Sequence, residues 1–274
     1  MNFIYKFLYF LQEEMTRPTV FGWFHIIWLI FTFIMIYIFY KRKKFHDEKQ
    51  LKIILGVYGI IAFVLELLKQ LIWSFNYDVN LNIVTWDYQW YAFPFQLCST
   101  PIYVSIFCLF LKNGKLRNYL LSYMAYFTIL GSISMMIYPE SCFVSDILVN
   151  IHTMWLHMGS FVVSVYLLMS GEVKININSL KNAIYVFLLF VFSALLLNVF
   201  VYKSGILGDE TFNMFYISPY FKSSLPIFDI IWEYVHYIVF LIIYIWALIL
   251  GSLIIYGISK FICYISNKID CKKI

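Results

Sequence analysis

Apolar residues run through this chain in long stretches that short polar clusters separate. A helix rises about 1.5 Å per residue, so about 20 apolar residues cross a hydrocarbon layer of about 30 Å. Stretches of that length occur at residues 20–40, 51–74, 95–112, 117–138, 148–170, 181–202 and 229–259. The pattern therefore predicts an all-α polytopic membrane protein with seven transmembrane helices.

Composition excludes a soluble globular domain. Hydrophobic residues make up 62% of the chain and charged residues only 13%, whereas charged residues approach about a quarter of a soluble domain. We expect a single transmembrane domain over 1–274, with the helical bundle at 20–259 and a cytoplasmic tail at 260–274. The segment 1–19 opens with an aromatic-rich stretch that is too short to span, which indicates an interfacial helix.

Basic residues predict the orientation, because cytoplasmic connections retain lysine and arginine during insertion. Alternate connections hold fifteen of the twenty: Lys41, Arg42, Lys43, Lys44, Lys49, Lys52, Lys112, Lys115, Arg117, Lys174, Lys181, Lys260, Lys268, Lys272 and Lys273. The opposite connections hold Lys6, Arg17, Lys203 and Lys222, while Lys69 lies in a predicted helix. This places the N-terminus outside and the C-terminus in the cytoplasm. The net charge of +5 then reflects basic residues that mostly mark the cytoplasmic face. Nothing in the pattern of these residues indicates nucleic-acid binding.

Polar side chains inside the apolar stretches are costly and therefore candidates for function. They are His25, Glu66, Lys69, Cys98, His152, His157, Asn198, Asp229, Glu233 and His236. With the predicted orientation, nearly all lie in the outer half of the bilayer. This clustering predicts a polar cavity that opens outward below the connections 75–94 and 203–228. The alternative is a set of unrelated hydrogen bonds between helices.

Spacing relates some of these residues to each other. Glu66 and Lys69 are three positions apart on one helix and can form an ion pair. Asp229, Glu233 and His236 follow the i, i+4, i+7 spacing of one helical face.

Short motifs resemble the YwaF-like family of bacterial integral membrane proteins over about residues 20–260. The motifs are FPFQLCSTP, WLHMGS and NMFY, and the matching positions are Pro94, Cys98, Pro139, His157, Asn213 and Tyr216. Gln96 stands where the family has a histidine, and DIIWEYVHY replaces a tryptophan- and proline-rich opening of the last helix. That family is in turn similar to a eukaryotic transmembrane phospholipid acyltransferase with a cysteine nucleophile.

The resemblance implies phospholipid acyl transfer or ester hydrolysis in the outer leaflet. A cysteine attacks an ester as thiolate and needs a base, most often histidine, so Cys98 is the candidate nucleophile and His157 the candidate base. Glu66 or Glu233 would orient the imidazole, and Lys69 or the outer connections would hold a phosphate. The supporting pocket also includes Gln96, His152, Asn213, Tyr216, Asp229 and His236. We expect no cofactor and no metal.

Two other functions fit the same residues. In the first, the protein binds or transports a lipid or small solute without chemistry. In the second, several histidines and carboxylates bind a metal ion and the protein is a metal-dependent membrane hydrolase. His152 and His157 are five positions apart, which is not the tight spacing of common zinc helices. The excess of lysine over arginine, with much Ile, Phe, Tyr and Asn, is typical of a low-GC bacterium and predicts a bacterial plasma membrane.

Overall fold

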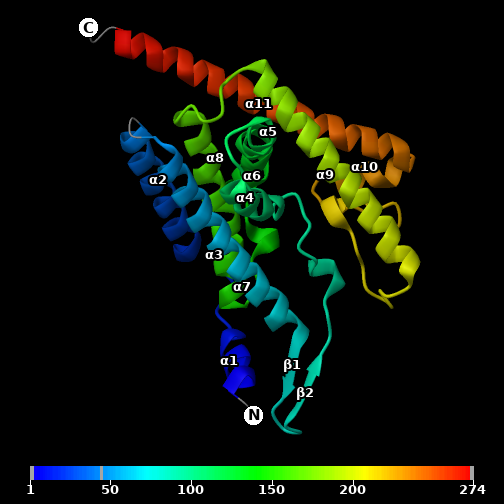
Figure 1. The fold of residues 1–274 in the computed structure, drawn as a ribbon. Helices are drawn as coiled ribbons and strands as arrows, with labels where there is room; N and C mark the ends of the chain where they lie inside the picture. The colour runs from blue at the N-terminus through cyan, green and yellow to red at the C-terminus, as the bar shows by residue number, and fades with distance from the viewer. Residues whose placement is uncertain (1–2, 44–45, 272–274) are drawn as a thin grey trace.

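The protein is an assembly of helices with one small hairpin (Figure 1). The computed structural model describes residues 3–43 and 46–271, so Lys44, Lys272 and Lys273 of the basic set lie outside the described part. The helical elements are α1 (Phe3–Leu11), α2 (Trp23–Arg42), α3 (Glu48–Ser74), η2 (Trp90–Ala92), α4 (Thr100–Phe110), α5 (Lys115–Tyr123), η3 (Met124–Thr128), α6 (Ile129–Ile137), η4 (Glu140–Cys142), α7 (Ile147–Met154), η5 (Trp155–Gly159), α8 (Ser160–Met169), α9 (Ile177–Ser204), η6 (Met214–Tyr216), α10 (Phe228–Tyr234) and α11 (Tyr237–Cys271). The strands β1 (Phe75–Asp78) and β2 (Ile83–Trp86) pair antiparallel.

Among the described residues, six helices are long and apolar enough to cross a membrane: α2, α3, the continuous helix Lys115–Ile137, the continuous helix Ile147–Met169, α9 and Tyr237–Ile265. The remaining expected span, 95–112, is the 11-residue helix α4. Proline fits the first helical turn but disrupts an interior. Pro101 therefore stands at the start of α4, and the chain from Pro94 to Ser99 does not continue the helix. Six spans plus one short helix replace the predicted seven, and their orientation stays a prediction.

The last expected span is divided in two. Val235 is extended, with φ −129° and ψ 153°, and separates α10 from α11. Asp229 and Glu233 lie on the short α10, while His236 lies between the two helices. The prediction that these three residues share one helical face is therefore wrong, because the helix that would align them is interrupted.

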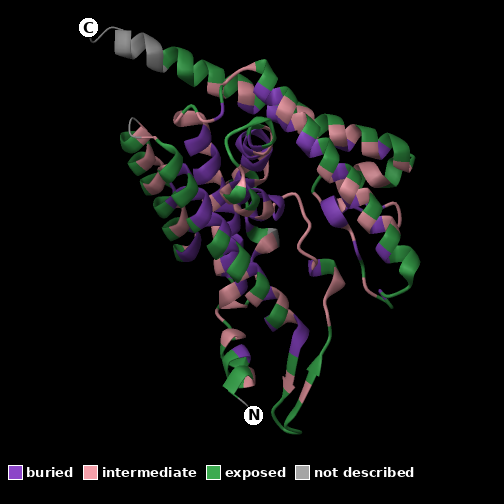
Figure 2. Cartoon of the chain, viewed as in Figure 1, coloured by how far each residue is buried: buried purple, intermediate pink, exposed green. Residues whose placement is uncertain are grey.

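The helices Lys115–Ile137 and Ile147–Met169 form the centre of the bundle. In the most apolar stretch of Ile147–Met169, 72% of residues are buried, against 17% in α2 and 22% in α11. Figure 2 shows this contrast as a buried interior with exposed outer helices. Since the exposed residues of α2 and α11 are largely apolar, they suit contact with lipid chains.

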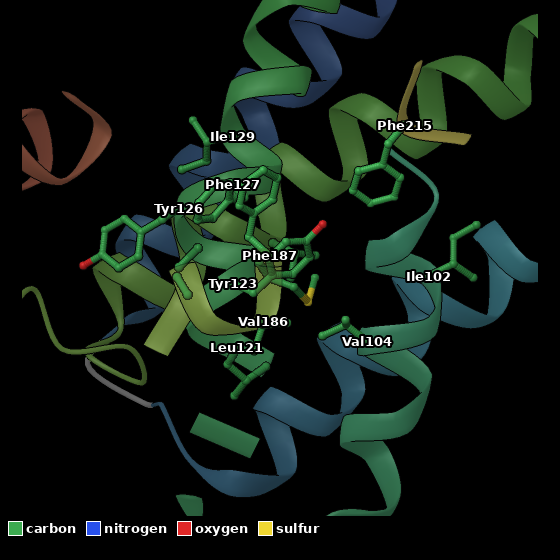
Figure 3. Packing of buried hydrophobic residues seen from close by; sticks show 14 of the residues in the cluster. Ile102, Val104, Leu121, Tyr123, Tyr126, Phe127, Ile129, Val186, Phe187 and Phe215 are labelled. Atoms are coloured by element: carbon green, nitrogen blue, oxygen red, sulfur yellow. The ribbon is translucent and has the colours of Figure 1, made fainter. Parts of the chain in front are cut away.

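Aromatic stacking and one close helix contact organise the interior. The rings of Phe127 and Phe187 stack with centroids 4.4 Å apart, and Tyr123 lies beside them (Figure 3). Helices α3 and α4 meet at Gly59, where an added Cβ would lie 2.9 Å from the Cβ of Ser105. A side chain at Gly59 would therefore push α4 away from the bundle.

The N-terminal segment is attached to the end of α3. The Gln12 side chain donates hydrogen bonds to the carbonyls of Ile72 and Phe75, each at 2.7 Å. These are carbonyls at the C-terminal end of a helix, which lack donors within the helix. Helix α1 and the β1–β2 hairpin lie at the same end of the molecule, away from the C-terminus (Figure 1). The interfacial position of α1 stays a prediction.

An ion-pair network, here called the Arg117 clamp, joins three connections at the other end. Arg117 is 1% exposed and contacts Glu48 Oε1 at 2.5 Å and Glu172 Oε1 at 3.2 Å. His46 Nε2 lies 3.1 Å from Glu172 Oε2, and His46 Nδ1 lies 2.7 Å from the Tyr166 hydroxyl. The connections that hold most of the basic residues therefore meet at one end, as their alternation along the chain predicts.

Removing the central cation should destabilise the bundle. Truncating one member of a buried ion pair leaves the other charge unpaired and costs about 3 kcal/mol or more, so we expect Arg117→Met to lose about 3 kcal/mol. Reversible unfolding in mixed micelles measures this loss. The matched control is Lys115→Met, two positions earlier and exposed, which should change little. Equal stability of the two variants would contradict the role of the clamp.

Candidate functional site

A small cavity brings Cys98 and His157 together, although they are 59 positions apart in the sequence. Its lining comes from the turn before α4, from η3 and α6, and from η5 and α8: Leu97, Cys98, Phe127, Thr128, Gly131, Ser132, His157 and Ser160. The cavity measures about 10 Å³, at the lower limit for one water molecule. The cavity therefore holds at most one water molecule and is too small for a substrate without local movement.

The turn that carries Cys98 is held by hydroxyl groups. Thr100 Oγ1 lies 2.7 Å from the Leu97 carbonyl and 2.6 Å from the Tyr123 hydroxyl. Tyr103 donates a hydrogen bond of 2.5 Å to the carbonyl of Pro94. Because Pro94 and Pro101 prevent a regular helix here, these contacts fix the thiol at the start of α4 instead of in the middle of a span.

Two π-helical turns, η3 and η5, flank the cavity. Such turns widen a helix locally and are frequent at functional sites. Side-chain donors reach their carbonyls: Ser164 Oγ binds the Met124 carbonyl at 2.8 Å, and Ser160 Oγ binds the His157 carbonyl at 2.9 Å. The donor to η3 thus comes from another helix, whereas the donor to the His157 carbonyl comes from the next turn of the same helix.

Hydroxyl groups complete the wall, and the sequence analysis missed them. Ser132 Oγ and Ser160 Oγ lie 3.0 Å apart. Thr128 is 6% exposed, and its Oγ1 has no hydrogen-bond partner among the described residues. Single serines and threonines are common in membrane helices and do not mark a site. The only sequence signal was the spacing of Thr128 and Ser132, which are four positions apart and so share one helical face.

Cys98 and His157 share the cavity without a direct hydrogen bond. In the described part of the chain, neither the thiol of Cys98 nor the ring of His157 is hydrogen-bonded to the other. His157 is 9% exposed and Cys98 is partly exposed. Catalytic hydrogen bonds often form only when a substrate is bound, so this spacing is compatible with proton transfer between the two groups.

A second buried group, here called the Glu66 network, lies on α3 and α7. Glu66 Oε1 is 2.7 Å from Lys69 Nζ, and Glu66 Oε2 is 2.8 Å from His152 Nε2, an ion-pair distance without the alignment of a hydrogen bond. Gln70 donates to Glu66 Oε1 at 2.8 Å and to the Ala92 carbonyl at 2.7 Å. Glu66 therefore contacts Lys69 and His152, and the expected contact with His157 is not made.

Gln96 connects the cysteine segment to the loop before α10. Its amide donates to the Asn213 carbonyl at 3.0 Å and accepts from the Phe215 amide at 2.7 Å. The bend at Phe215 and Tyr216 has positive φ at both residues, 58° and 57°, a conformation that costs free energy in residues other than glycine. Burial raises the pKa of the Tyr216 hydroxyl. Gln96 and Asn213 thus hold a strained bend against the cysteine segment.

The remaining members of the polar set lie elsewhere. Glu233 is exposed and forms an ion pair with Lys222, whose pKa is raised by this hydrogen bond. His236 is exposed, and its Nδ1 accepts from the Ile238 amide at 3.3 Å. Asp229 is partly exposed. None of these three lines the cavity, and of the expected polar set only Cys98 and His157 do.

Two further buried polar residues bind backbone groups, His25 within its own segment and Asn198 across to the loop at Met214. His25 is fully buried and accepts from the Phe21 amide at 3.1 Å. Asn198 binds both the amide and the carbonyl of Met214, at 2.7 and 3.0 Å. Across residues 3–43 and 46–271, no group of three or more His, Cys, Asp or Glu side chains could hold a metal ion.

Comparison with known protein families matches residues 20–253 to the TMEM164 family. The match covers most of the chain, including all residues of the cavity. No curated protein and no solved structure matches the chain. The narrower resemblance to YwaF-like proteins stays a prediction.

The Glu66 network should behave as one unit. Glu66→Ala leaves Lys69 buried without its carboxylate, so we expect a loss of about 3 kcal/mol in unfolding free energy. In a cycle with Lys69→Ala, the double variant should cost clearly less than the sum of the two single changes, because the interaction is shared. Unfolding in mixed micelles gives all three values, and additive losses would show that the network is not coupled.

Proposed function

The chain belongs to the TMEM164 family, and from that premise we propose that it transfers or hydrolyses acyl chains of membrane phospholipids, with Cys98 as nucleophile and His157 as general base. One observation carries the proposal: the thiol and the imidazole line one cavity, together with hydroxyl groups, inside a membrane-spanning bundle. A membrane-embedded, lipid-related function follows from the family and the helices. The cysteine chemistry is our proposal.

The reaction balances with groups of this chain alone. A ring nitrogen of His157 takes the proton of the Cys98 thiol, and the thiolate attacks the ester carbonyl carbon of a phospholipid. The bond between that carbon and the lysolipid oxygen breaks, and the histidine returns the proton to the leaving oxygen. The acyl group then remains on Cys98 as a thioester, from which an acceptor hydroxyl or water removes it.

We also assign a role to Thr128. The tetrahedral intermediate carries a negative oxygen, which catalytic sites stabilise with donors that are already positioned. Thr128 Oγ1 is buried at the cavity and has no partner among the described residues. A buried hydroxyl without a partner is costly, and an oxyanion in the cavity would provide one. We propose that Thr128 donates to that oxygen.

The proposal also includes a role for Lys69 and a location for the protein. We propose that Lys69, which lies 2.7 Å from Glu66, attracts a lipid phosphate through its charge. We propose the outer leaflet of a bacterial plasma membrane as the location, on the basis of the basic-residue pattern and the predominance of lysine. The resemblance to YwaF-like proteins supports the same location.

A binding protein without chemistry is the second candidate. It is favoured by the absence, in the described residues, of a hydrogen bond between Cys98 and His157. The two candidates differ in one observable, which is a covalent acyl group on Cys98.

Acyl transfer predicts a lipid-dependent thioester. Purified protein incubated with defined phospholipids should gain one acyl mass on the peptide that contains Cys98, detected by mass spectrometry. Cys98→Ala should abolish the adduct, and His157→Ala should slow its formation by about 10²-fold or more, the typical contribution of a general base. The matched control is Cys108→Ala, since Cys108 lies buried on α4 outside the cavity, and it should keep the adduct. Failure of the wild type to form any adduct would leave only the binding function.

The role of Thr128 makes a separate prediction. Thr128→Val keeps the shape of the side chain and removes the hydroxyl, so acylation should slow by about 10²-fold, as for other single oxyanion donors. Thr128→Ser keeps a hydroxyl and should retain most of the rate. Thiol labelling of Cys98 should be equal in both variants. If valine and serine variants react at the same rate, Thr128 has only a packing role.

A further inference from the structure

A second, larger cavity lies at the end of α9 and is independent of the cysteine site. Its volume is about 190 Å³, far above the roughly 10–15 Å³ that one water needs. We call it the 202–221 pocket, and its lining consists of Tyr202, Gly205, Leu207, Gly208, Asp209, Glu210 and Phe221. No residue of the Cys98 cavity takes part in it.

Two aromatic rings form a corner of this pocket. The rings of Tyr202 and Phe221 lie 5.8 Å apart at an angle of 79°. Tyr220 stacks on Tyr202 with centroids 3.7 Å apart and holds that ring in place. Both Tyr202 and Phe221 line the pocket, and an ammonium group within about 6 Å of an aromatic ring face is attracted to it.

The charged lining has one sign. Asp209 and Glu210 line the pocket, and no basic side chain does. Asp209 makes no ion pair or hydrogen bond within the described part of the chain, and Glu210 uses one oxygen to accept from the Trp90 amide at 2.7 Å. Lys222, next to Phe221, is paired with Glu233. The carboxylates of the pocket therefore lack a cation from the protein itself.

The turn that separates the rings from the carboxylates keeps the volume open. Gly205 and Gly208 have positive φ of 73° and 56°, and an added Cβ at either would meet nothing within 4 Å. Gly205 ends α9 in the left-handed conformation, which glycine adopts at low cost. The hollow thus results from a defined helix end.

We propose that the 202–221 pocket binds an alkylammonium group, as found in choline and ethanolamine headgroups. The perpendicular rings contact the cationic methyl or methylene groups, and Asp209 with Glu210 supplies the opposite charge. This binding does not depend on the acyl-transfer proposal, because no group of the Cys98 cavity takes part.

The pocket nevertheless has a path of contacts to the cysteine segment. Glu210 accepts a hydrogen bond from the Trp90 amide. A few positions later, Asn213 and Phe215 bind the side chain of Gln96, which lies two positions before Cys98. An occupied pocket would therefore fix the loop that holds Gln96.

Choline and its neutral isostere test the proposal directly. In 3,3-dimethylbutan-1-ol a carbon replaces the quaternary nitrogen, so shape is kept and charge is lost. With the full chain in detergent, saturation-transfer NMR should detect choline and not the isostere. Asp209→Asn and Phe221→Leu should each weaken choline binding about two- to fivefold, the range of single charge and cation–π contacts. Phe221→Tyr keeps an aromatic ring and should bind choline about as well as the unchanged protein. The matched control is Asp87→Asn, an exposed carboxylate outside the pocket.

Nanodiscs separate the two sources of the ammonium group. If phosphatidylcholine nanodiscs compete with free choline and phosphatidylglycerol nanodiscs do not, the ligand is a lipid headgroup. If neither competes while free choline still binds, the ligand is a soluble ammonium compound. Equal binding of choline and its isostere, or unchanged binding in Asp209→Asn, would overturn the proposal. A failed thioester assay with intact choline binding would refute only the cysteine chemistry.

Discussion

The site depends on how backbone carbonyls are satisfied where two central helices widen. Inside an apolar bundle no water replaces a missing hydrogen bond, so each irregular turn needs donors from side chains. At η3 and η5 these donors are serine hydroxyls, Ser164 and Ser160. The widened turns place Thr128 and His157 on one cavity wall, opposite the turn that carries Cys98. Small polar residues of the interior therefore support the widened turns and also line the cavity that contains Cys98 and His157.

Much of the helical framework could be predicted from the sequence, because stretches of about 20 apolar residues have few other solutions in a bilayer. The exceptions have local causes. Pro94 and Pro101 shorten the helix expected at 95–112, and the break at Val235 separates Asp229 and Glu233 from His236. The proximity of Cys98 and His157 in one cavity agrees with the motif resemblance. Thr128 and the π turns could not be predicted, because their geometry depends on contacts between helices and not on local spacing.

Charge is distributed differently at the two ends of the bundle. The Glu66 network pairs one carboxylate with Lys69 and His152 on two helices. The Arg117 clamp instead joins separate connections around one guanidinium, whose planar geometry can bind two carboxylates at once. The Glu66 network thus keeps its charges on two helices, and the Arg117 clamp joins segments that are distant in the sequence.

The Arg117 clamp also has a consequence for synthesis of the protein. Its members are separated by 69 and 55 positions, and Glu172 follows Arg117 only after the two central helices. A nascent chain that has inserted α3 and α5 can form only the contact with Glu48, which is half exposed. The clamp closes when the residues after α8 leave the ribosome. Insertion of the first helices is therefore separated in time from completion of the Arg117 clamp.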